Sequence, residues 1–212
     1  MSDNDGRWIE GGSEVDRIVY FSDAVFAIAI TLLALEIRLP DIASSTMPEL
    51  LDALVGILPK LSSYAISFWV VATLWMAHHR IFHYIEAFDR RLLLINLLLL
   101  MWVALIPFSG SMLGEYGEFQ VSVIVYCAHM VLASLNLAWL WWYACKDHRL
   151  VDPDMDPRVV RYNSARSFLM PVMFLIAILI SFVNVNVAEF SLLLIFLVRP
   201  AALKYAQSRT AG

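Results

Sequence analysis

The sequence predicts an all-α membrane protein whose single domain, residues 1–212, crosses the bilayer six times. Three observations lead to this prediction. Hydrophobic residues form 60% of the chain and charged residues 16%, and the mean hydropathy of +0.70 is far above that of a soluble domain. Six apolar stretches are long enough to cross a bilayer, which takes about 20 helical residues. Lysine and arginine also gather in segments that alternating spans would place on one side.

The expected spans cover residues 19–39, 56–82, 92–112, 119–145, 167–183 and 187–206. The first follows an acidic N-terminal segment with no basic region or cleavage site, so we expect it to remain in the mature protein. The second begins as an amphipathic segment containing Pro59, which can kink a helix or occupy its first turn. The short polar segment NVNVAE separates the last two spans and favours an antiparallel hairpin.

The basic residues predict the orientation of these spans. If the N-terminus is cytoplasmic, most of the lysines and arginines fall on the cytoplasmic side, as the positive-inside rule requires. We therefore expect a multi-pass protein of the cell membrane with both termini in the cytoplasm. The expected cytoplasmic residues are Arg7, Arg17, Arg80, Arg90, Arg91, Lys146, Arg149, Arg158, Arg161, Arg166, Arg199, Lys204 and Arg209, and the expected outer ones are Arg38 and Lys60.

The first span carries polar residues at its cytoplasmic start. Ser22 and Asp23 can satisfy free amide groups and the positive end of the helix dipole there. Arg17 stands six residues earlier, and an arginine, a serine and an aspartate at one depth can form charge-assisted hydrogen bonds. The second span ends at the same depth in residues 75–79, WMAHH, which can complete a polar cluster between helices.

Farther along the first span, Ala24, Ile28, Thr31 and Leu35 follow one another at steps of four, three and four residues. At about 100° per residue this spacing places them in one narrow stripe, and Asp23 points elsewhere. The stripe can line a pathway. Alternatively, Ile28 and Leu35 are ordinary lipid-facing or core residues, and the Thr31 hydroxyl bonds to the carbonyl four residues earlier. Spacing alone leaves both interpretations open.

The pattern Arg-x-x-x-Phe-Ser-Asp, formed by Arg17, Phe21, Ser22 and Asp23, resembles the opening of the transmembrane protein 175 family of potassium channels. The six-span layout, the segment LWMAHHRIF and the short final hairpin extend the resemblance over most of the chain. It implies a channel without a carbonyl filter, and the sequence contains no Thr-Val-Gly-Tyr-Gly segment. For a chain with one repeat, it also implies a homotetramer around a central pore lined by the first helix.

The resemblance further implies roles for individual residues. Ile28 would form the apolar constriction of the pore, Thr31 would supply a hydroxyl, and Leu35 would form a second apolar ring. Potassium and other monovalent cations would permeate, and neither a cofactor nor a nucleic acid is expected. The polar cluster between helices would contain Arg17, Phe21, Ser22 and Asp23 together with Trp75 and either His78 or His79.

A metal or haem protein is one competing interpretation. His79 and His83 stand four residues apart on one helical face, but His129 in the fourth span has no companion at a matching depth. Cys127 and Cys145 lack the spacing of a zinc site or a disulfide framework. No nucleophile motif or glycine-rich phosphate loop indicates an enzyme.

A proton-coupled secondary transporter and a proton-conducting channel also compete with the potassium channel. Transporters usually place ionisable groups near the middle of the membrane. Here the notable polar residues at that depth are uncharged, and the asparagines are expected to hydrogen-bond between helices. A hydrated apolar pore can also admit protons. These mid-membrane residues are Thr31, Ser67, Asn96 and Asn136.

Overall fold

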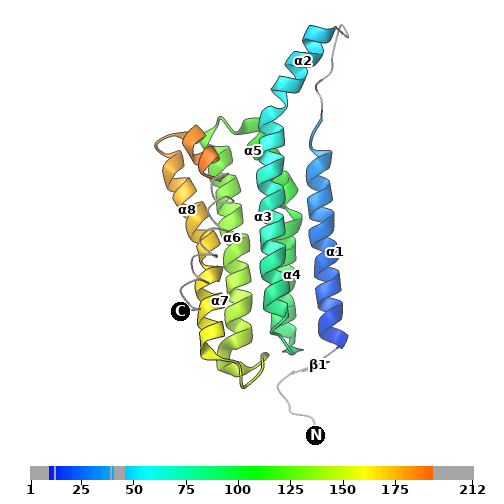
Figure 1. Cartoon of the computed structure of the whole chain (residues 1–212), viewed down its shortest axis with the longest axis vertical. Helices are drawn as coiled ribbons and strands as arrows, with labels where there is room; N and C mark the ends of the chain where they lie inside the picture. Colours follow the sequence, from blue (N-terminus) through cyan, green and yellow to red (C-terminus); the bar gives the residue numbers. More distant parts are fainter. Residues whose placement is uncertain (1–9, 12, 39, 41–45, 193–212) are drawn as a thin grey trace, which may run out of the picture.

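The computed structural model describes residues 10–11, 13–38, 40 and 46–192, and these form a bundle of helices with nearly parallel long axes (Figure 1). Within the described residues, five segments are long and apolar enough to cross a membrane. They are Glu14–Leu35, Met47–Phe82, Arg90–Tyr116, Gln120–His148 and Pro157–Ser181.

Each of the first five expected spans overlaps one of these segments. The sixth expected span, 187–206, lies mostly outside the described residues, and only its first part, 187–192, is seen, as helix. Six spans therefore remain a prediction. The first two helical segments also start earlier than hydropathy suggests, at Ser13 and Met47.

The start of the first helix is tied to the loop that follows the second span. Helix α1 (Ser13–Leu35) comes after a two-residue strand, β1 (Glu10–Gly11). This strand pairs antiparallel with β2 (Ala87–Phe88), so that Glu10 is opposite Phe88. The pairing therefore holds the start of α1 next to the loop that follows the second span.

Three of the spans are interrupted. Helix α2 (Met47–Gly56) is followed by α3 (Leu58–Phe82), α4 (Arg90–Ala104) by α5 (Ile106–Tyr116), and α7 (Pro157–Ser167) by α8 (Leu169–Ser181). Each interruption has a proline just beyond it. Pro59, Pro107 and Pro171 lie in the first turns of α3, α5 and α8, where the missing N–H and the ring are tolerated but the preceding helix cannot continue unbroken. At the first break α2 leans away from the bundle (Figure 1).

Helix α6 (Gln120–Cys145) forms the centre of the bundle and ends in the short 3-10 helix η1 (Lys146–His148). It packs on α3, α4, α5, α7 and α8. Helix α1 packs mainly on α3, α4 and α5. Accordingly, 61% of the most apolar stretch of the span Gln120–His148 is buried, whereas only 28% of the most apolar stretch of the span Glu14–Leu35 is buried.

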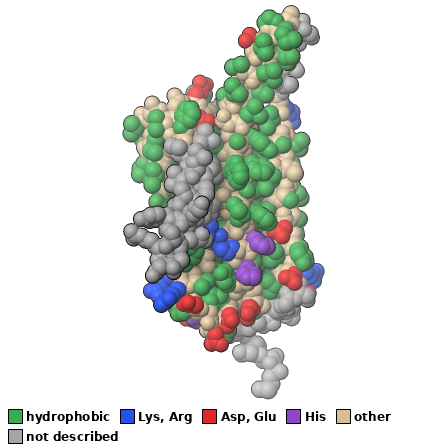
Figure 2. Space-filling model, in the orientation of Figure 1, with side chains coloured by type: hydrophobic (Ala, Val, Ile, Leu, Met, Phe, Trp, Pro, Cys, Tyr) green, Lys and Arg blue, Asp and Glu red, His purple; other side chains and the backbone are tan. Residues whose placement is uncertain are grey.

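Charge is distributed unevenly between the two ends of the bundle. Among the described residues, Arg38 and Lys60 lie at the end where α1 stops and α3 begins, whereas the other lysines and arginines lie toward the opposite end. Figure 2 shows most of the visible charged side chains near that opposite end. The expected basic residues Arg7, Arg199, Lys204 and Arg209 lie outside the described residues.

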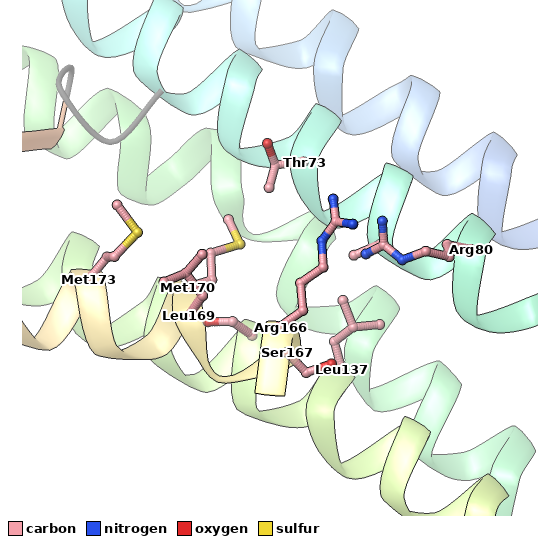
Figure 3. A pocket seen from close by; sticks show the side chains of 10 residues that line it. Thr73, Arg80, Leu137, Arg166, Ser167, Leu169, Met170 and Met173 are labelled. Carbon is pink, nitrogen blue, oxygen red and sulfur yellow. The ribbon is translucent and has the colours of Figure 1, made fainter. Parts of the chain in front are cut away.

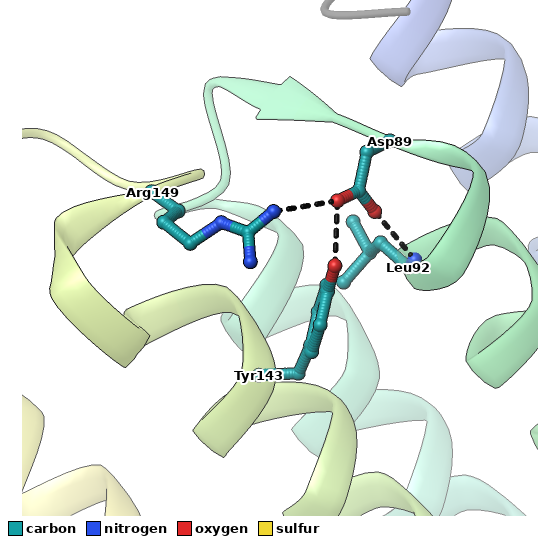
Figure 4. Close-up of polar contacts among 4 residues, drawn as sticks. All are labelled: Asp89, Leu92, Tyr143 and Arg149. Carbon is teal, nitrogen blue, oxygen red and sulfur yellow. Dashed lines mark hydrogen bonds and ion pairs between the residues drawn. The ribbon is translucent and has the colours of Figure 1, made fainter. Parts of the chain in front are cut away.

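A buried carboxylate stabilises the basic end. Asp89 caps α4 by accepting a hydrogen bond from the Leu92 N–H at 2.8 Å, and its other oxygen accepts one from Tyr143 Oη at 2.6 Å (Figure 4). Arg149 Nη2 lies 3.3 Å from that second oxygen. The network joins α4, α6 and the segment after η1.

Candidate functional site

Helix α1 has two opposite faces. Ser22, Phe26, Ala29 and Leu33 form a buried stripe, and each is at most 3% exposed. The stripe of Ala24, Ile28, Thr31 and Leu35 is offset by two residues, or about 200°, so it points the opposite way. The described part of the chain leaves this second stripe uncovered: Ile28 is 57% exposed and Leu35 is 65% exposed.

Thr31 is oriented by its own helix. Its hydroxyl donates a hydrogen bond to the Ile28 carbonyl at 2.8 Å, three residues back instead of the four expected from the sequence. Since the proton is used in this way, the oxygen keeps its lone pairs for another partner. Thr31 can therefore present an acceptor, and not a donor, to whatever lies beside α1.

Small side chains lie among the exposed residues of α1, together with the larger Leu32. Ala24, Ala27 and Ala34 are also exposed on α1. In membranes, small residues allow helix backbones to approach closely, because no side chain holds them apart. The exposed side of α1 can therefore pack tightly against another helix.

A buried chain of hydrogen bonds holds the start of α1 to α4 and α3. Ser22 donates its only hydroxyl proton to the Ile18 carbonyl at 2.8 Å, so it can only accept from Asn96 Nδ2 at 3.0 Å. The Asn96 amide therefore turns its oxygen toward His78 Nε2, which is 3.0 Å away. Because this oxygen can only accept, the proton of the hydrogen bond must be on His78 Nε2. Ser22, His78 and Asn96 are at most 1% exposed.

A second contact joins α1 to α3 nearer the surface. Trp75 Nε1 donates to Asp23 Oδ1 at 2.8 Å, and His79 stacks on the Trp75 ring with centroids 5.7 Å apart. The two histidines that the sequence left undecided thus have different neighbours. His78 reaches Ser22 through Asn96, whereas His79 lies beside the tryptophan.

Two residues of the expected cluster stand apart from it. Arg17 Nη1 lies 3.1 Å from Glu14 Oε1, the Arg17 side chain is 75% exposed, and no described contact joins it to Ser22 or Asp23. The expected bonds from Arg17 to that pair are therefore replaced by the pair with Glu14. Six residues rotate a helix by about 600°, so Arg17 and Asp23 do not share a face, whereas a residue three positions away does. Phe21 is 56% exposed.

Two contacts of α1 were not predicted from the sequence. Asn96 was expected to bond between helices, but its partners could not be assigned; the available signal was a lone amide in the apolar run LLLINLLLL. At the other end of α1, Ser111 donates a hydrogen bond to Glu36 Oε2 at 2.9 Å. Helix α1 is thus held at both ends while its middle is exposed on one side.

The histidine of α6 is already bonded. His129 Nδ1 lies 2.8 Å from Ser109 Oγ, and its Nε2 lies 2.9 Å from the Trp102 carbonyl. Neither ring nitrogen is left for a metal. Within the described residues, no group of three or more histidine, cysteine or acidic side chains is arranged to hold one.

Comparison with known proteins adds to this geometry. Residues 17–107 match the family described as "Endosomal/lysosomal potassium channel TMEM175". A potassium channel of Streptomyces collinus is 36% identical over 176 residues, 81% of this chain and 84% of that protein. The crystal structure of a lysosomal potassium-selective channel TMEM175 homolog from Chamaesiphon minutus superposes with a TM-score of 0.78 at 31% identity, covering 91% of this chain and 98% of the other. The rat endosomal/lysosomal proton channel TMEM175 is 24% identical over 161 residues, which are 32% of its length.

Proposed function

The chain belongs to the TMEM175 family, and from this premise we propose that it is a potassium channel whose pore is lined by α1. The family membership suggested by the Arg-x-x-x-Phe-Ser-Asp motif is confirmed, and the family is one of ion channels. Potassium permeation is supported by the names of the bacterial relatives. The assignment of the pore depends on one observation, the uncovered stripe of Ile28, Thr31 and Leu35, which we call the pore face.

We place four copies around one axis, with each pore face turned inward. One exposed helix cannot enclose a pathway, and closed rotational symmetry is the usual way to repeat such a face around a centre. The exposed alanines of α1 support the arrangement, because they let neighbouring copies of the helix approach. In this proposal the basic end of the bundle lies in the cytoplasm, where both termini are also expected.

Ile28 and Leu35 form two apolar rings in this assembly. A narrow apolar ring stops ions by excluding water, and a slightly wider one admits hydrated ions. Small movements of α1 therefore suffice to gate the pore. No cofactor takes part.

Thr31 lies between the two rings and supplies the polar atoms of the pathway. Its hydroxyl proton is bonded to the Ile28 carbonyl, so four threonine oxygens face the axis as acceptors. Four neutral oxygens replace only part of the hydration of a potassium ion. Selectivity for potassium over sodium is therefore modest, and other monovalent cations also pass.

Reconstitution into liposomes with a potassium gradient tests this proposal. Leu35→Ser widens and wets one ring, so potassium efflux is expected to rise several-fold. Leu179→Ser is the matched control, because Leu179 is 68% exposed on α8 and Leu35 is 65% exposed on α1. Equal flux from both variants and the wild type contradicts the assignment of the pore face.

Proton conduction is the second candidate, favoured by the names of the vertebrate relatives, of which the rat protein is one. Residues 24–35 contain no ionisable side chain, so any protons would travel through water in the pore. The same liposomes, loaded with a pH-sensitive dye, distinguish the cases. In liposomes prepared without potassium and placed in an acidic buffer, a proton channel acidifies the liposome lumen, whereas a proton-coupled transporter moves protons only together with its substrate and saturates.

A further inference from the structure

A cavity lies between α3, α6, α7 and α8, on the side of the bundle away from α1. Thr73 and Arg80 line it from α3, Leu137 from α6, Arg166 from α7 and Met170 from α8 (Figure 3). Arg80 is in the last turn of α3, so this part of the cavity lies near the basic end of the bundle. Nothing in the proposed permeation pathway uses it.

Two arginines meet in this cavity without an acidic partner among the described residues. Figure 3 shows the guanidinium groups of Arg80 and Arg166 next to each other. The Nε atoms of both are buried, and no described residue accepts a hydrogen bond from them. The ion pairs within the described residues involve Arg17, Lys60 and Arg149, and neither cavity arginine belongs to one. Two adjacent half-buried cations repel each other and lose hydration, so the arrangement favours an anion between them.

Phosphate fits this pair better than a simple anion does. A guanidinium presents a planar fork of N–H donors that matches two oxygens of a phosphate group. Thr73, whose hydroxyl makes no hydrogen bond to a described residue, also lines the cavity. The cavity measures about 30 Å³, room for roughly two water-sized atoms. It can hold two oxygens of a phosphate group, which is what a guanidinium fork binds, while the rest of the group lies outside.

We propose that Arg80 and Arg166 bind a single phosphate group at this site. The rest of a phospholipid can remain outside, since most of the other lining side chains, such as Leu137 and Met170, are apolar. Exposed tryptophans near the basic end of α6, Trp139 and Trp142, are typical of the membrane–water interface, where lipid phosphates lie. The same chemistry would also recognise free phosphate in solution.

The full-length channel, purified in a phosphate-free nonionic detergent, provides the test. Its melting temperature is measured during titration with phosphatidylglycerol, with inorganic phosphate, and with an uncharged diacylglycerol. The variants are Arg80→Gln and Arg166→Gln, with Arg161→Gln as control, because Arg161 is an exposed arginine of the same helix α7. A ligand that binds only the folded state raises the melting temperature.

Phosphatidylglycerol is expected to stabilise the wild type and Arg161→Gln, and the two cavity variants should need at least a tenfold higher lipid concentration. If inorganic phosphate alone reproduces this pattern, the proposal holds and the source is soluble phosphate. Arg166→Lys keeps the charge but lacks the fork, so it should bind at an intermediate concentration even if a glutamine variant fails to fold. A wild type that neither phosphate-containing ligand stabilises, or cavity variants that respond like Arg161→Gln, overturn the proposal.

Discussion

Helices α1 and α8 both leave one long side uncovered by the described residues, and the residues on these two sides differ in kind. The most apolar parts of their spans are 28% and 22% buried, so the degree of exposure does not separate them. The exposed residues of α8 are large and apolar: Leu169, Val172, Leu175, Ile176 and Leu179. Those of α1 include Tyr20, Phe21 and Leu32 near or beside the pore face, but they also mix alanines and a threonine with Ile28 and Leu35. The first pattern suits lipid, whereas the second suits close helix packing and a wet pathway.

The polar contacts of the two helices differ in the same way. Ser22 of α1 is joined to Asn96 on α4 and through it to His78 on α3. The serine of α8, Ser181, bonds within the described chain to its own helix, at the Ile178 carbonyl 2.7 Å away. A helix that must hold its orientation against a pore has more need of cross-links to other helices than one that faces lipid.

The largest effect is expected from cutting this cross-link. Asn96→Ala leaves Ser22 and His78 buried without their partner, and each unsatisfied group costs about 1–3 kcal/mol. The melting temperature and the yield of assembled protein should both fall sharply, as read from thermal unfolding and size-exclusion chromatography. Asn186→Ala is the control, since Asn186 is exposed outside the described spans and should behave as wild type. If the Asn96→Ala protein is as stable as this control, the hydrogen bonds from Asn96 to Ser22 and His78 do not hold α1 in place.

The next largest effect separates the two uncovered faces directly. Ile28→Ser makes the proposed constriction polar, so we expect several-fold higher potassium flux and weaker selectivity. Ile176→Ser is the matched change on α8, because Ile176 is 50% exposed and Ile28 is 57% exposed. Flux should stay at the wild-type level there. If the α8 variant changes flux as much as the α1 variant, the two faces have the same role and the comparison fails.

A smaller effect is expected at Thr31. Thr31→Val keeps the shape of the side chain but removes the oxygen that bonds to Ile28 at 2.8 Å. Potassium flux should persist, and the preference for potassium over sodium should fall a few-fold, because the pore face loses its polar ring. Reversal potentials in planar bilayers with potassium on one side and sodium on the other measure this ratio. An unchanged ratio places the selectivity elsewhere.

The smallest effect is expected at the edge of the polar cluster. Trp75→Phe removes the hydrogen bond to Asp23, but Trp75 is 38% exposed, so water can replace it. The loss should be about 1 kcal/mol, a typical net value for one hydrogen bond. Thermal unfolding of the Trp75→Phe and Asn96→Ala proteins, measured side by side, shows which substitution causes the larger loss of stability. A loss as large as that of Asn96→Ala would mean that the surface contact, and not the buried chain, holds α1.

The sequence predicted the parts of the molecule that depend on composition and helical spacing. Five expected spans have counterparts because hydropathy over about 20 residues reports burial in a bilayer directly. The stripe from Ala24 to Leu35 lies on one uncovered side because helical periodicity fixes relative directions within one element.

Partners between elements were harder to predict. Asn96 bonds to residues of two other helices that lie 18 and 74 positions away, and no local pattern encodes that pairing. The expected placement of Arg17 was wrong for a different reason, because a shared depth in the membrane does not bring two side chains together when the helix turns them to different faces. The helix breaks near Pro107 and Pro171 were foreseeable from the missing N–H of each proline.

The most direct test of the pore face is chemical access to Thr31 during ion flow. In Thr31→Cys channels, a charged thiol reagent should enter with the ions, attach inside the ring and block potassium flux in liposomes. Leu175→Cys on the uncovered side of α8 is the control, and flux through it should continue after the same treatment; Cys127 is buried, and a wild type given the same reagent sets the background. Block of Thr31→Cys alone is the predicted result. Unhindered flux through modified Thr31→Cys would show that α1 does not line the pathway.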